Sequence, residues 1–168
     1  QIHAFDAPAT VAGQGTVIAE WEDQDLQADT VLIAVGGGGL IGGAMAWLDG
    51  RCKIVGVEPF NAPTLTQALE NGPETKVEVS GIAANALGAK QVGRICYNLV
   101  QMTGTVCVNV EDAAIAKAQL MLWENLRQLV EPAGATALAA LLAGAYVPQK
   151  GERVAVLLCG ANPADHPL

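Results

Sequence analysis

Short apolar runs alternate along the chain with longer segments whose apolar residues recur at helical spacing. The apolar runs predict strands at 31–35, 52–57, 105–110 and 153–158. Helical spacing predicts helices over 11–25, 40–48, 63–70, 87–102, 113–129 and 132–145. This alternation is typical of a mostly parallel sheet covered by helices on both faces. We therefore expect a three-layer αβα fold, with residues 1–168 forming a single α/β domain.

Four consecutive glycines, Gly36, Gly37, Gly38 and Gly39, join the strand at 31–35 to the helix that follows it. Backbone N–H groups and the positive end of the helix converge at such a turn, and a phosphate approaches the backbone most closely where Cβ atoms are missing. The loop therefore predicts a phosphate site. The plainer interpretation is a tight turn that lets helix and strand pack.

A dinucleotide site is a competing interpretation of the same loop. Gly37, Gly39 and Gly42 have the spacing G-x-G-x-x-G, and Glu58 ends the next predicted strand about 20 residues further along, where a ribose-binding acid would lie. A Walker-type ATP loop is excluded, because no Lys-Ser or Lys-Thr pair follows the glycines.

Charge and composition narrow the choice of partners. The net charge of −8 argues against nucleic acid and anionic membranes, and no apolar stretch reaches the roughly 20 residues of a membrane span. The four cysteines contain no C-x-x-C pair, and His3 and His166 stand at opposite ends of the chain, so no zinc pattern is present. We expect a cytoplasmic protein that binds a small molecule.

Residues that follow the predicted strands are the candidate site, because ligands of open parallel sheets bind beyond the carboxyl ends of the strands. The strands lead into the glycine loop, Glu58, the pair Glu111 and Asp112, and the segment 159–162. A thiol and an amide, those of Cys159 and Asn162, are thus expected at the same edge as the glycines.

Six ordered motifs resemble the later motifs of serine/threonine dehydratases, pyridoxal-phosphate enzymes of the tryptophan-synthase-β fold type. They are His3-Ala4-Phe5-Asp6, Ala12-Gly13-Gln14-Gly15-Thr16, Gly36-Gly37-Gly38-Gly39-Leu40, Gly56-Val57-Glu58-Pro59, Glu131-Pro132-Ala133-Gly134-Ala135 and Cys159-Gly160-Ala161-Asn162. The resemblance covers essentially the whole chain. It implies the second half of the large domain of that fold.

The resemblance also implies roles for individual residues. Gly36 to Gly39 with Leu40 would hold the phosphate of pyridoxal phosphate, Cys159 would face the pyridine nitrogen, and Glu131 and Asn162 would line the ring pocket. Without the resemblance, Cys159 is a small buried hydrophobe and Glu131 simply opens a helix in front of Pro132.

The chain departs from the family at the lysine that binds the cofactor aldehyde. That lysine belongs to an upstream Ser-x-Lys-x-Arg-type motif, whereas the only serine here, Ser80, precedes Gly81 and Ile82. The chain starts at Gln1 in what resembles the middle of the family's sequence, so we expect an upstream segment that is missing here. Without the lysine there is no general acid or base for the α-proton, and we expect no catalysis by this polypeptide alone.

A second departure concerns a divalent cation. Related enzymes use the acid of the Glu-Pro motif, a carbonyl four residues on and an acid six residues on, which correspond to Glu58, Ala62 and Thr64. Threonine replaces the second acid, so Glu58 and Ala62 form only a weak candidate metal site.

Three functional hypotheses remain open. The chain is a truncated ammonia-lyase that acts on serine or threonine when an upstream part is supplied, a non-catalytic binding or assembly module of the same fold, or a dinucleotide-binding oxidoreductase domain. Half of a fold leaves apolar surface uncovered, so we expect a homo-oligomer, most simply a dimer. We also expect Gly38→Asp to abolish phosphate binding and leave the fold largely intact.

Overall fold

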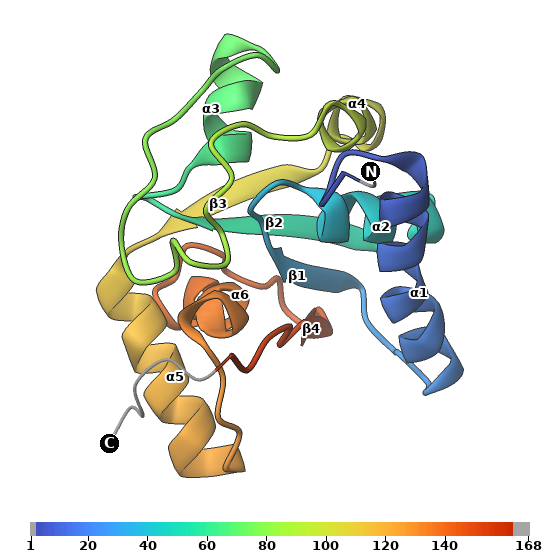
Figure 1. Ribbon diagram of the computed structural model, residues 1–168. Helices are drawn as coiled ribbons and strands as arrows, with labels where there is room; N and C mark the ends of the chain where they lie inside the picture. The colour runs from blue at the N-terminus through green and yellow to red at the C-terminus, as the bar shows by residue number, and fades with distance from the viewer. Residues whose placement is uncertain (1–2, 163–168) are drawn as a thin grey trace.

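The computed structural model describes residues 3–162, which contain one four-stranded parallel sheet (Figure 1). Its strands are β1 (Thr30–Ala34), β2 (Lys53–Pro59), β3 (Val106–Val110) and β4 (Val154–Val156), in the order β3-β2-β1-β4. β1 pairs in parallel with β2 and β4, and β2 pairs in parallel with β3. The predicted parallel sheet is confirmed, with β1 and β2 at its centre.

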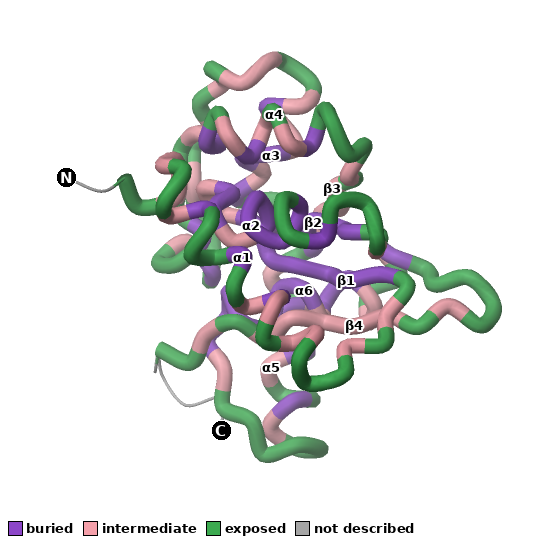
Figure 2. Tube along the Cα trace, turned by 90° about the vertical axis from the view of Figure 1, so that its right-hand side faces the viewer, coloured by how far each residue is buried: buried purple, intermediate pink, exposed green. Residues whose placement is uncertain are grey.

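Helices cover both faces of this sheet. They are α1 (Pro8–Asp23), α2 (Gly39–Leu48), α3 (Thr64–Asn71), α4 (Arg94–Thr103), α5 (Asp112–Leu126) and α6 (Pro132–Leu142). Leu32 of β1 packs in the core formed with α5 and α6, whereas its neighbours Val31 and Ile33 pack in the core formed with α1, α2 and α4. All five residues of β1 are buried, as the continuous purple trace in Figure 2 shows. The predicted αβα layering is therefore confirmed.

The helix predicted over 87–102 is wrong in its first part, because α4 begins only at Arg94. Leu87 packs in the core on the α6 side, whereas Val92 packs in the core on the α4 side. The segment between them is a loop, in which the carbonyl of Lys90 accepts the N–H of Val77 (2.9 Å). Val92 packs in the same core as Cys96 and Val100 of α4, so it continues the apolar spacing of the helix although it precedes it.

Other elements differ from the prediction mainly at their ends. α1 begins at Pro8 rather than Val11, and the last strand is limited to Val154–Val156. α5 ends at Leu126, because Arg127 adopts a left-handed backbone with φ 55°. β2 continues through Pro59, which places Glu58 inside the strand rather than after it. No helix within residues 3–162 is long and apolar enough to cross a membrane.

Candidate functional site

The glycine loop at the carboxyl end of β1 borders a pocket of about 390 Å³. Most of the predicted site residues line this pocket together: Gly36, Gly37, Gly38, Gly39, Leu40, Glu131 and Cys159. Asn162 is exposed and does not line it. Sequence reasoning did not assign Phe5 or Leu87 to the site, although both line the pocket. For Phe5 a signal was available, since it stands in the first of the six motifs.

Backbone N–H groups around this loop are free to bind a ligand. α2 begins at Gly39, and the first amides of a helix have no acceptor within it. The N–H groups of residues 36–41 donate no hydrogen bond to another described residue, and no side chain caps the helix. These donors and the positive end of α2 make a site for an anion that involves no Lys or Arg side chain.

The glycines are also required by packing against the protein. A Cβ atom at Gly37 would lie 2.3 Å from the ring of Phe5, and one at Gly38 would lie 2.5 Å from Sγ of Cys96. Gly38 has a left-handed backbone with φ +90°, which side-chain-bearing residues rarely adopt. Gly38→Asp would therefore strain the loop itself, contrary to our expectation that this substitution leaves the fold largely intact.

Glu131 is the residue that directly precedes α6, and it lines the glycine pocket. Its side chain is buried, with 7% of the residue exposed, and its backbone N–H donates to the carbonyl of Gly160 (3.2 Å). The Oε2 atom is buried and has no hydrogen-bond partner among the described residues. Because a buried carboxylate oxygen without a donor is costly, this atom favours a ligand that brings a hydrogen-bond donor.

Cys159 follows β4 and lies at the same pocket. Its thiol is not in a disulfide. Desolvation by the surrounding protein, together with the nearby Glu131 carboxylate, raises the pKa of Cys159 above its usual value. The group facing the pocket at neutral pH is therefore the uncharged thiol, a weak hydrogen-bond donor and acceptor.

Glu58 serves another purpose than the sequence suggested. It is fully buried in β2, and its carboxylate accepts the N–H groups of Leu65 (2.6 Å) and Thr66 (2.9 Å) and the hydroxyl of Thr66 (2.8 Å). These donors belong to the first turn of α3, so Glu58 caps this helix. Burial raises the pKa of Glu58, while the hydrogen bonds from α3 oppose this shift.

These hydrogen bonds bear on the two ligands that the sequence suggested for Glu58, the ribose of a dinucleotide and a divalent cation. Both of its oxygens are engaged by α3, so the dinucleotide hypothesis loses its ribose-binding acid. Ala62 and Thr64, the other positions of the cation pattern, are fully buried, and the Thr64 hydroxyl donates to the carbonyl of Ala89 (2.7 Å). No cluster of three or more His, Cys, Asp or Glu side chains suited to a metal is found in residues 3–162.

The remaining candidates at the strand ends do not line the glycine pocket. Asp112 opens α5 and accepts the N–H of Ile82 (3.1 Å), and Glu111 is exposed. His3 accepts the N–H groups of Phe5 and Asp6 through Nδ1, and His166 lies outside the described residues. None of the five lysines lines the glycine pocket: Lys53, Lys76, Lys90, Lys117 and Lys150.

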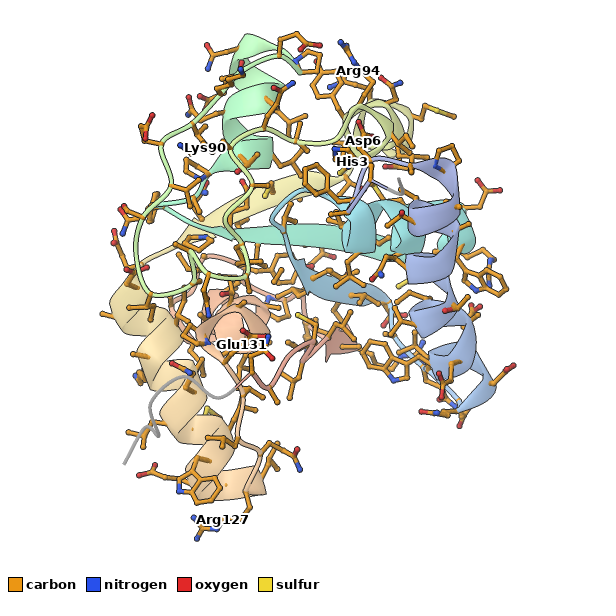
Figure 3. All side chains as sticks on the ribbon, in the orientation of Figure 1. His3, Asp6, Lys90, Arg94, Arg127 and Glu131 are labelled. Atoms are coloured by element: carbon orange, nitrogen blue, oxygen red, sulfur yellow. The ribbon has the colours of Figure 1, made fainter. Side chains whose placement is uncertain are left out.

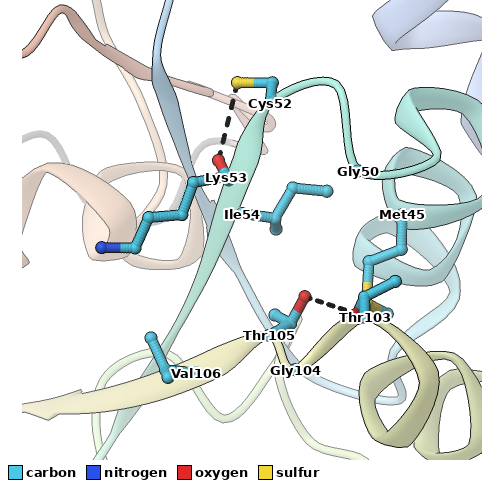
Figure 4. A pocket seen from close by; sticks show the side chains of 9 residues that line it. All are labelled: Met45, Gly50, Cys52, Lys53, Ile54, Thr103, Gly104, Thr105 and Val106. Atoms are coloured by element: carbon cyan, nitrogen blue, oxygen red, sulfur yellow. Dashed lines mark hydrogen bonds between the residues drawn. The ribbon is translucent and has the colours of Figure 1, made fainter.

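A second pocket, of about 260 Å³, lies at the opposite edge of the sheet, between the start of β2 and the end of α4 (Figure 4). Its polar groups already have partners. The hydroxyls of Thr103 and Thr105 share a hydrogen bond of 2.8 Å, and the ammonium of Lys53 contacts the hydroxyl of Tyr146 (3.1 Å). The glycine pocket is therefore the stronger candidate for a ligand.

Comparison with known proteins places this chain in a family. A family model described as pyridoxal-phosphate dependent enzyme matches residues 1–160. The chain therefore belongs to the pyridoxal-phosphate dependent enzymes.

Proteins similar to this chain in sequence or structure include a dehydratase, an ammonia-lyase and a deaminase. The chain is 35% identical to phenylserine dehydratase of Ralstonia pickettii, over 96% of this chain and 50% of that protein. It is 34% identical to L-threonine ammonia-lyase of Thermotoga maritima, over 96% of this chain and 40% of that protein. Processed threonine deaminase isoform 2 of Solanum lycopersicum superposes with a TM-score of 0.88 at 30% identity, covering 97% of this chain and 46% of that one. The chain thus spans half or less of the length of these relatives.

The contact between Phe5 and Gly37 leads to a stability prediction. Gly37→Ala places a methyl group against the Phe5 ring and is expected to lower the free energy of unfolding by about 1–3 kcal/mol. In a Phe5→Ala background, where the ring is absent, the same change should cost at least about 0.5 kcal/mol less. Urea unfolding of the four proteins measures this coupling.

Gly13→Ala is the matched control for this cycle. Gly13 lies within α1 and has nothing within 4 Å of an added Cβ, so alanine there should stabilise the protein by about 0.5–1 kcal/mol. An equal cost of Gly37→Ala in both backgrounds would show that Phe5 does not limit the loop.

The cap formed by Glu58 leads to a second prediction. Glu58→Ala leaves two N–H groups of α3 without acceptors and should lower the free energy of unfolding by about 2–4 kcal/mol at pH 7. Glu70→Ala, on the exposed side of the same helix, should change it by less than about 0.5 kcal/mol. Equal stability of the two variants would contradict the capping role.

The stability difference between the wild type and Glu58→Gln should also depend on pH. Because the pKa of Glu58 is raised in the folded state, the folded protein binds a proton more readily than the unfolded chain above about pH 4.5. The stability of the wild type relative to the non-titrating glutamine variant should therefore fall as the pH rises through the raised pKa. Denaturant unfolding at several pH values measures this difference.

Proposed function

We propose that this chain is the C-terminal part of a pyridoxal-phosphate-dependent serine/threonine dehydratase, an ammonia-lyase that converts a β-hydroxy amino acid to a 2-oxo acid. The observation that carries the proposal is the single pocket lined by the glycine loop, Glu131 and Cys159, with unengaged N–H donors on the loop. The names of the relatives, threonine and phenylserine dehydratases among them, support this substrate class.

In this proposal each part of the pocket meets a different part of the cofactor. The N–H groups of residues 36–40 hold the phosphate at the start of α2. Cys159 faces the pyridine nitrogen as an uncharged thiol, which, unlike a carboxylate, does not force that nitrogen to be protonated. Glu131 lines the ring pocket through its unpartnered oxygen, and Asn162 joins it by resemblance alone. Pyridoxal phosphate, when bound, would supply the electron sink for α,β-elimination, in which the substrate loses its α-proton and its β-hydroxyl group.

We further propose that the polypeptide alone is not catalytic. No lysine lines the glycine pocket, so no ammonium group is placed to hold the cofactor aldehyde or to move the α-proton. The same observation also supports the alternative function, a non-catalytic module that binds the cofactor or assembles through this half of the fold.

We propose self-association for both alternatives, the dehydratase fragment and the non-catalytic module. The second half of α5 carries exposed apolar side chains, since Leu120, Met121 and Leu126 are 38%, 41% and 60% exposed, and β4 is a strand at the edge of the sheet. Such surface favours a partner, most simply a second copy in a dimer. The unpaired thiols of the four cysteines favour a cytoplasmic protein.

Ligand titration tests the proposed site. Pyridoxine 5′-phosphate is the suitable probe, because it lacks the aldehyde that would react with surface lysines. By calorimetry, it should bind at least about tenfold more tightly than pyridoxine, since the loop amides and the α2 dipole act on the phosphate. Inorganic phosphate should compete. Equal affinity for the two compounds would overturn the phosphate site.

An activity assay tests the catalytic part of the proposal. The chain, mixed with pyridoxal phosphate and serine or threonine, should form no measurable pyruvate or 2-oxobutyrate. Turnover by the chain alone would contradict its inactivity. Adding a separately made, lysine-bearing first half of a relative such as the Thermotoga maritima ammonia-lyase distinguishes a split enzyme, which regains turnover, from a non-catalytic module.

A further inference from the structure

Residues 3–6 lie directly against the glycine loop. An added Cβ at Gly37 would meet the ring of Phe5, and one at Gly39 would lie 3.1 Å from the Cα of Phe5. The segment is itself fixed in place, because Nδ1 of His3 accepts the N–H of Asp6 (2.9 Å) and the carbonyl of His3 accepts the hydroxyl of Thr10 (2.8 Å). Phe5 therefore contacts the loop from a defined position.

The side chain of Asp6 lies near the start of α4, and Figure 3 shows it close to Arg94, the first residue of that helix. Its Oδ1 atom accepts the N–H of Ile95 at 2.9 Å. Ile95 belongs to the first turn of α4, whose amides lack acceptors within the helix, and the residue in front of the helix is Gly93, which has no side chain. Asp6 thus caps α4 from a distant part of the chain, and its charge suits the positive helix end.

The turn that Asp6 caps also holds the glycine loop. The N–H of Gly93 donates to the carbonyl of Gly37 (2.9 Å), and the side chain of Cys96 lies under Gly38. In a trans peptide the carbonyl and the next N–H point in opposite directions. Fixing the Gly37 carbonyl toward α4 therefore turns the Gly38 N–H away from α4. Gly38 lines the pocket and no residue of α4 does, and the Gly38 N–H donates no hydrogen bond to another described residue. An N–H turned away from α4 is therefore turned toward the pocket.

We infer that Asp6 is a positioning residue for the phosphate loop: by capping α4 it holds Gly93 against the Gly37 carbonyl and so orients the Gly38 N–H toward the bound phosphate. The inference rests on the proposed function, because it needs a phosphate ligand in the glycine pocket. Asp6 itself does not line the pocket, so it acts through α4 and the loop rather than on the ligand.

Three substitutions in the 168-residue chain test this role, with pyridoxine 5′-phosphate and pyridoxine as probes. Asp6→Ala removes the acceptor for Ile95 and should weaken binding of pyridoxine 5′-phosphate at least about fivefold. Asp6→Asn keeps an oxygen acceptor and should stay within about twofold of the wild type. Asp23→Ala, which removes an exposed carboxylate at the end of α1, should leave affinity unchanged.

The phosphate-free probe separates positioning from general loss of structure. Affinity for pyridoxine should be the same in Asp6→Ala and in the wild type, because only the phosphate depends on the loop amides. Equal weakening for both probes, or full retention of phosphate affinity in Asp6→Ala, overturns the inference. Failure of the proposed function differs from both, since the wild type itself would then not prefer the phosphorylated probe.

Gly93→Ala provides a second variant should Asp6→Ala fail to fold. Its new Cβ would lie 2.9 Å from Oδ1 of Asp6 and displace the carboxylate, while the backbone of Gly93 (φ −65°) accepts alanine. A phosphate-specific loss is expected there as well. Unchanged preference for the phosphorylated probe in a folded Gly93→Ala protein would again overturn the role of Asp6.

Discussion

At the carboxyl end of β1 the backbone of the glycine loop touches its neighbours so closely that side chains have no room. Added Cβ atoms on Gly36 and Gly37 would lie 3.1 Å and 2.3 Å from Leu87 and Phe5, and one on Gly38 would lie 2.5 Å from Cys96. These contacts join residues 3–6, the loop before α4 and the start of α2. The protein thus packs against the Cβ side of the loop, and the amides remain free for a ligand. Glycine is required here by packing, because an added Cβ would collide with neighbouring residues. It is also favoured for phosphate binding, because an anion approaches the backbone most closely where Cβ atoms are missing.

Two buried glutamates differ in whether their carboxylates accept hydrogen bonds from the first amides of a helix. Glu58 lies within reach of α3, and both of its carboxylate oxygens accept hydrogen bonds from the first turn of that helix. These oxygens are therefore engaged within the protein rather than offered to a ligand. Glu131 precedes α6 but does not cap it through its side chain. Glu131 lines the glycine pocket, and its buried Oε2 atom has no hydrogen-bond partner among the described residues. Sequence position alone, at or near the end of a strand or the start of a helix, does not distinguish these two outcomes.

The sequence predicted the sheet well because residues 31–34 of β1 and 54–57 of β2 are buried and carry no polar side chain. It failed at 87–93, because Leu87 and Val92 pack in cores on opposite faces, a difference that one-dimensional spacing does not express. It also ended β2 too early, since Pro59 lies within the strand, where the following Phe60 N–H still donates to Val110 (3.0 Å). The link from Asp6 to Ile95 joins residues 89 positions apart, and no local pattern indicates such a contact.

For an acidic protein to bind an anion, the attraction must be local. The net charge of −8 repels a phosphate at a distance, but salt screens this repulsion beyond about 8 Å at physiological ionic strength. Within that range the pocket offers backbone N–H groups and the end of a helix, about half a positive charge, and its lining holds no Lys or Arg. Glu131 is the charged residue of the lining and would repel a simple anion. The pocket therefore favours a ligand with a phosphate at one end and a hydrogen-bond donor at the other, which agrees with the proposed cofactor better than with phosphate alone.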